Sequence, residues 1–224
     1  MINYYSEILN SSNLEKCYEI APPRVKQFLQ AEINFVLNSI KHNDLVLDLG
    51  CGYGRIAFRL LEKAKKVVGI DISKDNVQLA KKTALSNNKL EFYVMDAKKL
   101  DFPDSYFTTT ICVQNGISAF KVDPLELLKE SVRVTKKGGT ILYSSYSEKF
   151  WNHRLKWFEI QSENKLIGEI DYELTKNGTI VCKDGFTATT YSRQEFLELA
   201  SKNNVQSEIF EIDNSSIFCK MKVK

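Results

Sequence analysis

A glycine-rich loop that follows a short apolar run is the segment best suited to bind a ligand. The run Leu45–Leu49 contains one acidic residue, Asp48, and the loop Gly50–Gly54 comes directly after it. Glycine lets a backbone approach a ligand closely, and a helix that begins after the loop offers unpaired N–H groups. The Gly-x-Gly-x-Gly spacing differs from the Gly-x-Gly-x-x-Gly of dinucleotide loops. We expect this tighter loop to bind a smaller ligand that carries an amino-acid portion.

Carboxylates follow the next two apolar runs along the chain. Asp71 follows the run 66–70, and Asp96 with Ala97 follows the run 90–95. A carboxylate at Asp71 can accept hydrogen bonds from two ribose hydroxyls. Asp96 and the backbone N–H of Ala97 are suited to an adenine edge. Because the carboxyl ends of parallel strands meet at one sheet edge, we expect these groups to converge on one ligand.

The elements that position these groups alternate between strand and helix. Short apolar runs predict strands at 45–49, 66–70, 90–95, 108–113 and 140–144. Helical spacing between them, with capping residues at Ser73 and Asp123, predicts the connecting helices. Ser192 opens a further helix, and two closing strands are expected near 205–212 and 216–223. The alternation predicts a mostly parallel α/β sheet with right-handed crossovers.

The rhythm breaks near Phe150. The pair Asn177–Gly178 predicts a hairpin turn between strands at 172–175 and 179–182, and Asp184–Gly185 predicts a second turn. We interpret residues 148–191 as an insertion that carries a small antiparallel element. No internal repeat or linker separates the parts, so the sequence predicts a single domain over residues 1–224.

Five motifs in this order resemble the class I S-adenosylmethionine-dependent methyltransferases: Asp48–Gly54, Gly69–Ser73, Met95–Ala97, Leu100–Phe107 and Val132–Gly139. The resemblance spans roughly residues 42–147. It implies a Rossmann-like, seven-stranded, mostly parallel sheet with helices on both faces. It also implies S-adenosylmethionine as methyl donor and S-adenosylhomocysteine as product. Residues 42–147 then form the cofactor-binding core, 1–41 a helical lid, 148–191 a substrate cap and 192–224 the closing helix and strands.

The resemblance assigns cofactor-binding roles to residues at four strand ends: Asp48, Gly50, Cys51, Gly52 and Gly54, then Asp71 and Ile72, then Asp96 and Ala97, then Gln114 and Asn115. The glycine loop passes under the methionine and ribose portions, and Asp48 orients it. Asp71 holds the ribose hydroxyls, while Ile72 packs on the adenine. Asp96 binds the adenine amino group and the Ala97 N–H a ring nitrogen. The last pair lies beside the methionine portion.

The N-terminal lid contains further candidates for cofactor binding. Tyr18 is expected to close over the cofactor, and Arg24 to meet its carboxylate, with Tyr4 and Tyr5 as additional members. A lid of this kind orders on binding and excludes water. Ordinary helix packing and surface exposure are the alternative interpretation of the same residues.

The acceptor is the least determined part of the prediction. Aromatic residues gather after the fifth expected strand, and they predict either a small-molecule pocket or a small core under the hairpin. Among them Tyr146 and His153 are weak catalytic candidates, the histidine as a general base or merely as a surface residue. We expect a small-molecule N or O acceptor. RNA or protein methylation, and a non-catalytic regulatory protein that binds the cofactor, stay open as alternatives.

Composition adds several expectations. The net charge of +3, from 31 basic and 28 acidic residues, does not favour nucleic acid as a partner, although it leaves that partner open. Five widely spaced cysteines without a CxxC pair predict reduced thiols in a cytoplasmic protein and no metal site. No apolar run reaches the length of about 18 residues that a membrane helix needs, and no secretory signal is expected. A monomer and a homodimer are both compatible with the sequence.

Overall fold

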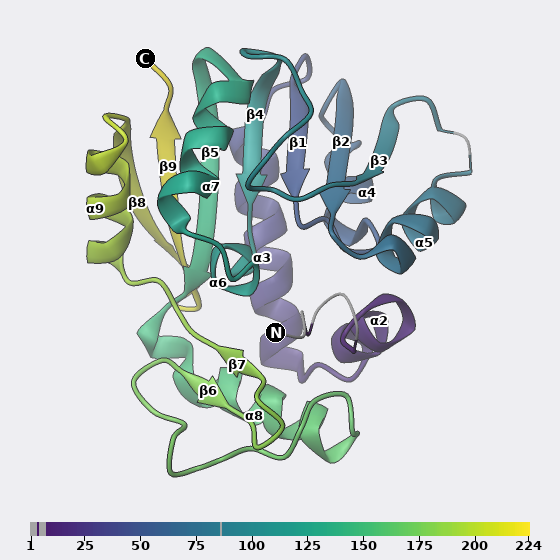
Figure 1. Ribbon diagram of the computed structural model, residues 1–224, viewed down its shortest axis with the longest axis vertical. Helices are drawn as coiled ribbons and strands as arrows, with labels where there is room; N and C mark the ends of the chain where they lie inside the picture. The colour runs from purple at the N-terminus through teal and green to yellow at the C-terminus, as the bar shows by residue number, and fades with distance from the viewer. Residues whose placement is uncertain (1–3, 5–7, 86) are drawn as a thin grey trace.

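A twisted seven-stranded sheet forms the centre of the computed structural model, which describes Tyr4, residues 8–85 and residues 87–224. The strand order is β3-β2-β1-β4-β5-β9-β8, and β9 alone runs opposite to the other six strands (Figure 1). The strands are β1 Leu45–Leu49, β2 Lys66–Asp71, β3 Leu90–Val94, β4 Phe107–Cys112, β5 Thr135–Tyr146, β8 Gln206–Ile212 and β9 Ser216–Lys222. The predicted Rossmann-like sheet is therefore confirmed.

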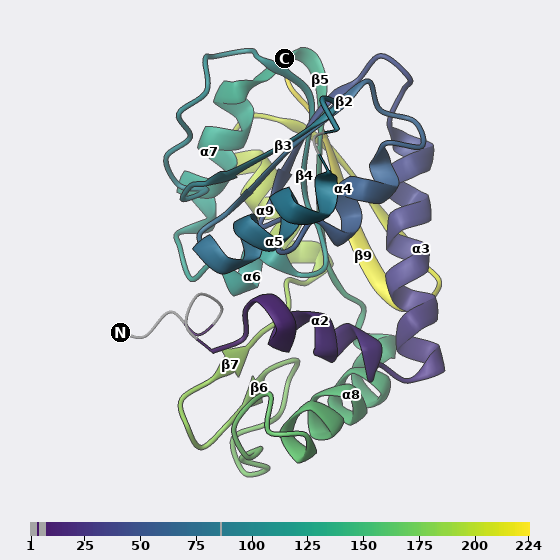
Figure 2. The same cartoon turned by 90° about the vertical axis from the view of Figure 1, so that its right-hand side faces the viewer.

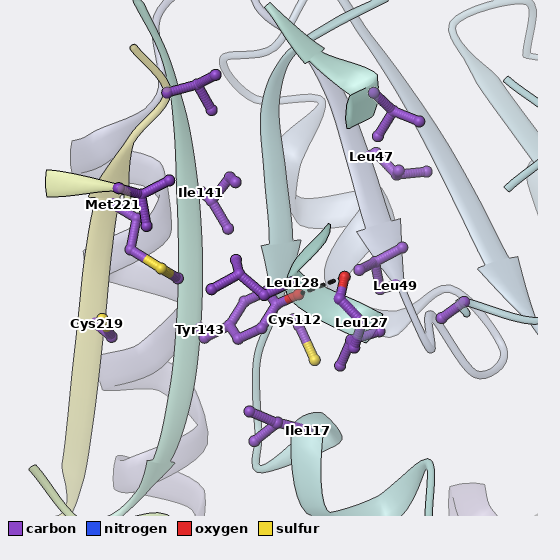
Figure 3. Packing of buried hydrophobic residues seen from close by; sticks show 14 of the residues in the cluster. Leu47, Leu49, Cys112, Ile117, Leu127, Leu128, Ile141, Tyr143, Cys219 and Met221 are labelled. Carbon is purple, nitrogen blue, oxygen red and sulfur yellow. Dashed lines mark hydrogen bonds between the residues drawn. The ribbon is translucent and has the colours of Figure 1, made fainter. Parts of the chain in front are cut away.

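Helices cover both faces of the sheet, and a separate apolar cluster lies between each face and its helices. One face packs against α3 Pro23–Ser39, α4 Arg55–Leu60 and α5 Lys74–Ala84, and the other against α6 Gly116–Ala119, α7 Pro124–Val134 and α9 Arg193–Lys202. Figure 3 shows the second cluster, where Tyr143 of β5 reaches α7. Its hydroxyl lies 2.7 Å from Ser131 Oγ, so this buried polar group has a partner.

Local sequence signals account for most element boundaries. Ser73 accepts a hydrogen bond from the Asn76 N–H at 3.2 Å, and Ser192 forms a capping box with Glu195. Two boundaries differ from the expectation by five residues or more. Helical spacing after the glycine loop continues to residue 66, but α4 ends at Leu60, and β5 begins at Thr135 rather than at Thr140. The early start of β5 follows from pairing, because Thr135 lies opposite Phe107 of β4.

A third apolar cluster lies outside the sheet and joins two distant segments of the chain. It combines residues 9–29, which include α2 Ser11–Glu19, with residues 146–188, which include η1 Glu148–Phe150 and α8 Trp151–Glu163. We call this unit the cap. Figures 1 and 2 show α2 between the rest of the cap and the edge toward which the parallel strands point. The second half of α3 packs on the sheet instead, so residues 1–41 contribute to two different units.

The antiparallel element of the cap has a different ladder from the predicted one. Asn177–Gly178 does form a tight turn with positive φ at both residues, closed by the Lys176–Thr179 bridge. The predicted strand at 172–175 does not form. The ladder instead joins β6 Ile180–Val181 to β7 Thr187–Ala188 around the Asp184–Gly185 turn. In place of pairing, Asp171 caps a turn by accepting hydrogen bonds from the N–H groups of residues 173 and 174.

Candidate functional site

The glycine loop is held to the second strand by hydrogen bonds that use its unusual backbone. The φ angles of Gly50, Gly52 and Gly54 are +69°, +55° and +89°, a region that favours glycine. Asp71 accepts a hydrogen bond from the Gly52 N–H at 2.9 Å through Oδ2. The Cys51 N–H donates to the carbonyl of residue 70 at 2.9 Å. The loop is therefore fixed at the carboxyl ends of β1 and β2, the edge where open α/β folds bind ligands.

Close approach of neighbouring side chains explains why this loop needs glycine. A Cβ at Gly50 would lie 2.5 Å from Phe120, and one at Gly54 would lie 2.9 Å from Phe58. Gly52 faces α2, since a Cβ there would lie 3.1 Å from Leu14. The loop is thus enclosed by β3, α4 and α6 and covered by α2 of the cap.

Asp48 is a buried carboxylate at the end of β1. The residue is 2% exposed, and its Oδ2 has no hydrogen-bond partner within the described chain. Burial, reinforced by the charge of Asp71, raises the pKa of Asp48 to about 7, while Arg55 opposes the rise. A buried carboxylate of this kind costs stability in the free protein, which is typical of a residue retained for a ligand.

Arg55 is a candidate site residue that was not predicted from the sequence. It follows Gly54 directly and begins α4. Its guanidinium carbon lies 4.3 Å from the centre of the Tyr18 ring, and its buried Nη2 lacks a hydrogen-bond partner among the described residues. The cation also lowers the pKa of Asp48. An arginine placed immediately after the last glycine of a ligand loop was the available signal.

The turn after β4 carries Gln114 and Asn115. The Gln114 N–H donates to Glu32 Oε2 at 2.9 Å and to Ser144 Oγ at 2.8 Å. Its side-chain Oε1 accepts from the Tyr18 hydroxyl at 3.2 Å, whereas its buried Nε2 has no partner in the part of the chain that the structure describes. In Asn115, by contrast, both ends of the side-chain amide are paired. Its Nδ2 donates to the Thr189 carbonyl, and its Oδ1 accepts from the Ser145 hydroxyl. Asn115 thus ties the turn to the cap.

Three unpaired polar atoms therefore belong to one connected group: Asp48 Oδ2, Arg55 Nη2 and Gln114 Nε2. Tyr18 joins them, since it stacks under Arg55 and donates to Gln114. Buried polar atoms are normally paired, so a set of orphans at the ligand edge indicates partners that the chain does not supply. The acceptor at Asp48 suits an ammonium, and the guanidinium suits a carboxylate. The donor set therefore fits the amino-acid end of S-adenosylmethionine.

The residues predicted for the nucleoside lie on the neighbouring strand ends. Besides Gly52, Asp71 accepts hydrogen bonds from the Ser73 N–H at 2.8 Å, and burial raises its pKa. Ile72 is 46% exposed, an unusual condition for isoleucine. Asp96 accepts from the Lys98 N–H at 3.0 Å and is half-buried, and Ala97 beside it is buried. These positions leave an apolar surface at Ile72 next to polar groups, an arrangement that suits an adenine.

The two candidates in the N-terminal segment have different surroundings. Tyr18 lies over the loop, with Tyr53 and Trp157 rings 6.2 Å and 6.1 Å away. Arg24 instead forms an ion pair with Asp213 at 2.6 Å and stacks on Phe150. The acidic partner that occupies Arg24 comes from the β8–β9 turn, which the sequence gives no reason to place there. Of the further candidates, Tyr4 donates to Asp184 at 2.9 Å, and Tyr5 lies outside the described residues.

The weak catalytic candidates lie in the cap. Tyr146 is 8% exposed and packs against Phe28, with the Arg154 guanidinium 4.5 Å from its ring centre. His153 is exposed and contacts Phe150 at 5.5 Å between ring centres. Both side chains are thus held by aromatic neighbours of the cap. The five cysteines are all buried and free, and no group of three metal-ligating side chains occurs within the described ranges.

Comparison with known proteins gives a consistent result. The profile of the methyltransferase domain family matches residues 46–139. The chain is 34% identical over 143 residues to 2-methyl-6-phytyl-1,4-hydroquinone methyltransferase of Synechocystis sp., a match that covers 59% of this chain and 42% of that protein. The chain therefore spans less than half the length of this relative.

Solved structures share the fold over a larger part of the chain. A protein from Pyrococcus horikoshii superposes over 100% of both chains, with a TM-score of 0.69 and 26% identity. A SAM-dependent methyltransferase from Methanosarcina mazei gives a TM-score of 0.64 at 21% identity, covering 84% of this chain and 97% of that one. Among the described residues, no helix is long and apolar enough to span a membrane.

Proposed function

We propose that the chain is a class I S-adenosylmethionine-dependent methyltransferase, which methylates a small molecule with S-adenosylmethionine as donor. The observation that carries the proposal is the group of unpaired buried atoms at Asp48, Arg55 and Gln114. When bound, the cofactor supplies a methyl group that is already activated on a sulfonium. Its product form is S-adenosylhomocysteine.

In this proposal, the residues around the loop divide the cofactor between them. Asp48 holds the ammonium end, and Arg55 holds the carboxylate together with the amide N–H group of Gln114. We assign the carboxylate to Arg55 because Arg24 is paired with Asp213. The strand-end residues Asp71, Ile72, Asp96 and Ala97 hold the nucleoside. The glycine loop lets the backbone approach closely enough for these contacts.

The cap supports a small acceptor. Leu14 and Tyr18 of α2 cover the loop, and the Trp157 indole N–H fixes α2 by donating to the Cys17 carbonyl at 2.9 Å. A polymer would reach the loop only if this helix moved. Because the donor is already activated, the protein contributes chiefly by aligning the acceptor and excluding water, and alignment alone is worth about 7–11 kcal/mol in favourable cases. The relative named for methylation of a hydroquinone supports the same class of acceptor.

The test is a transfer reaction with methyl-labelled S-adenosylmethionine. Purified protein is incubated separately with small-molecule, protein and RNA fractions of a cell extract, and label is measured in each. We expect label in the small-molecule fraction, and at least tenfold less of it at subsaturating S-adenosylmethionine when the Asp71→Asn variant replaces the wild type. Label in RNA or protein alone would replace the proposed acceptor with a macromolecule. Tight binding without transfer to any fraction would favour a regulatory protein that binds the cofactor.

A further inference from the structure

Glu32 is a carboxylate at the centre of the fold that the mechanism above does not use. It lies on the apolar side of α3 and is 0% exposed. One oxygen, Oε2, accepts from the Gln114 N–H at 2.9 Å, and Oε1 accepts from the Ser216 hydroxyl of β9. The side chain therefore connects α3 to the end of β4 and to β9. An acidic residue on the buried side of a helix is expensive and calls for a specific role.

The turn that Glu32 holds is strained. Gln114 and Asn115 have φ angles of +55° and +63°, two successive non-glycine residues in the left-handed region. Such conformations persist only where the surroundings enforce them, and they concentrate at functional sites. The side chain of Asn115 is fixed by Ser145 and Thr189, but the backbone N–H of Gln114 is fixed by Glu32 and Ser144. Glu32 is the charged member of this set.

We propose that Glu32 is a positioning residue, whose carboxylate holds the Gln114–Asn115 turn in the strained form that presents Gln114 to the cofactor. The inference rests on the proposed function, because the ligand of Gln114 is the cofactor. It requires no contact between Glu32 and the ligand. The orphaned Nε2 of Gln114 and its Oε1, which meets Tyr18, are aimed by the backbone that Glu32 fixes.

The surroundings make the charge of Glu32 titratable near neutrality. Burial raises its pKa to about 7, while hydrogen bonds from Ser216, Ser144 and the Gln114 N–H oppose the rise. The charged or titratable groups that act on it are Arg55 of α4, Tyr18 of α2 and Cys112 of β4. The ionised carboxylate is the stronger acceptor for the Gln114 N–H. The turn is therefore held most firmly above the pKa of Glu32.

A first experiment reads the contact itself by following the Gln114 amide in ¹⁵N–¹H NMR spectra of the full chain from pH 6 to 8. We expect the wild-type amide to titrate with a midpoint near the pKa of Glu32, and Glu32→Gln to lose most of that movement. Glu62→Gln, the same change at an exposed carboxylate, is the matched control and keeps the titration. A wild-type amide that does not move, or one that moves equally in Glu32→Gln, would overturn the inference.

A second experiment measures the affinity for S-adenosylhomocysteine by calorimetry at pH 8. Glu32→Ala is expected to weaken binding about tenfold, the effect of losing one buried charge-assisted hydrogen bond. Glu32→Gln, which retains a neutral acceptor, is expected to stay within about threefold of the wild type. A folded Glu32→Ala protein with wild-type affinity would overturn the inference. If Glu32→Ala does not fold, the amide titration of the wild type and of Glu32→Gln still decides it.

The two proposals fail in different ways. Wild-type protein that binds no S-adenosylhomocysteine refutes the proposed function, whatever the Gln114 amide does. Wild-type protein that binds, with unchanged affinity in folded Glu32→Ala protein, refutes only the positioning role of Glu32.

Discussion

Replacing Asp48 with asparagine should make the fold less sensitive to pH. Burial raises the pKa of Asp48 from an ordinary 3.8 to about 7, so between these values the native state holds more protons than the unfolded chain. The free energy of unfolding is therefore highest at low pH, where Asp48 is neutral in both states. It falls as the pH rises from about 3.8 to about 7. The asparagine amide cannot ionise, and the Asp48→Asn variant should lack this part of the decline.

The size of the effect follows from the pKa of Asp48. A tenfold change in acidity corresponds to about 1.4 kcal/mol, so ionisation of Asp48 should cost the wild type about 3 kcal/mol of unfolding free energy between pH 5 and pH 8. The orphaned Oδ2 leaves the ionised form without a hydrogen bond to offset this cost. The same substitution should weaken cofactor binding, because the charge that faces the ammonium is lost.

Urea unfolding at pH 5 and pH 8 measures the effect directly. The wild-type decline between the two pH values should exceed that of Asp48→Asn by about 3 kcal/mol. Asp101→Asn, at an exposed aspartate, provides the matched control and should follow the wild type. Parallel pH dependence in Asp48→Asn and the wild type would refute the claim that Asp48 is buried and unpaired.

Three further substitutions test the surroundings of the site. Gly50→Ala should destabilise the fold by about 1–3 kcal/mol in urea unfolding, since φ is +69° and the new Cβ meets Phe120; wild-type stability would contradict this. Trp157→Phe removes the indole bond to Cys17, and amide exchange in α2 should accelerate while the sheet is unaffected. Arg154→Met leaves the carbonyls of Gly178 and Ala188 without their buried donor, and a loss of about 3 kcal/mol is expected; a loss below about 1 kcal/mol would show that the guanidinium does not organise the cap.

The sheet and its ligand edge were predictable because the sequence marks them locally. Period changes, the glycine loop after Leu49, and the caps at Ser73 and Ser192 each constrain a few adjacent residues, and the structure places them as expected. The cap was harder. Its core forms between residues 9–29 and 146–188, and no local pattern records which distant segments will share a core. The strand predicted at 172–175 is absent for a related reason. The Asn177–Gly178 pair determines the turn, but it does not determine how many residues pair on either side of it.

The electrostatic partners in the site were the least accessible from sequence. Arg24 is the receptor for a carboxylate that we expected from the sequence, and only the fold shows that Asp213 occupies it while Arg55 lies beside the glycine loop. Glu32 interrupts the apolar face of α3 with a carboxylate, yet its partners lie more than 80 residues away. Helical periodicity shows that a charged residue lies on an apolar face, but its hydrogen-bond partners are determined by tertiary contacts.

The proposed function requires that the sheet edge after β1 and β2 binds S-adenosylmethionine. Its most direct test is a calorimetric titration of the wild type and of Asp71→Asn with S-adenosylhomocysteine, with Asp101→Asn as control. We predict saturable micromolar binding to the wild type and the control, and binding at least tenfold weaker to Asp71→Asn. Absence of saturable binding to folded wild-type protein would contradict the account.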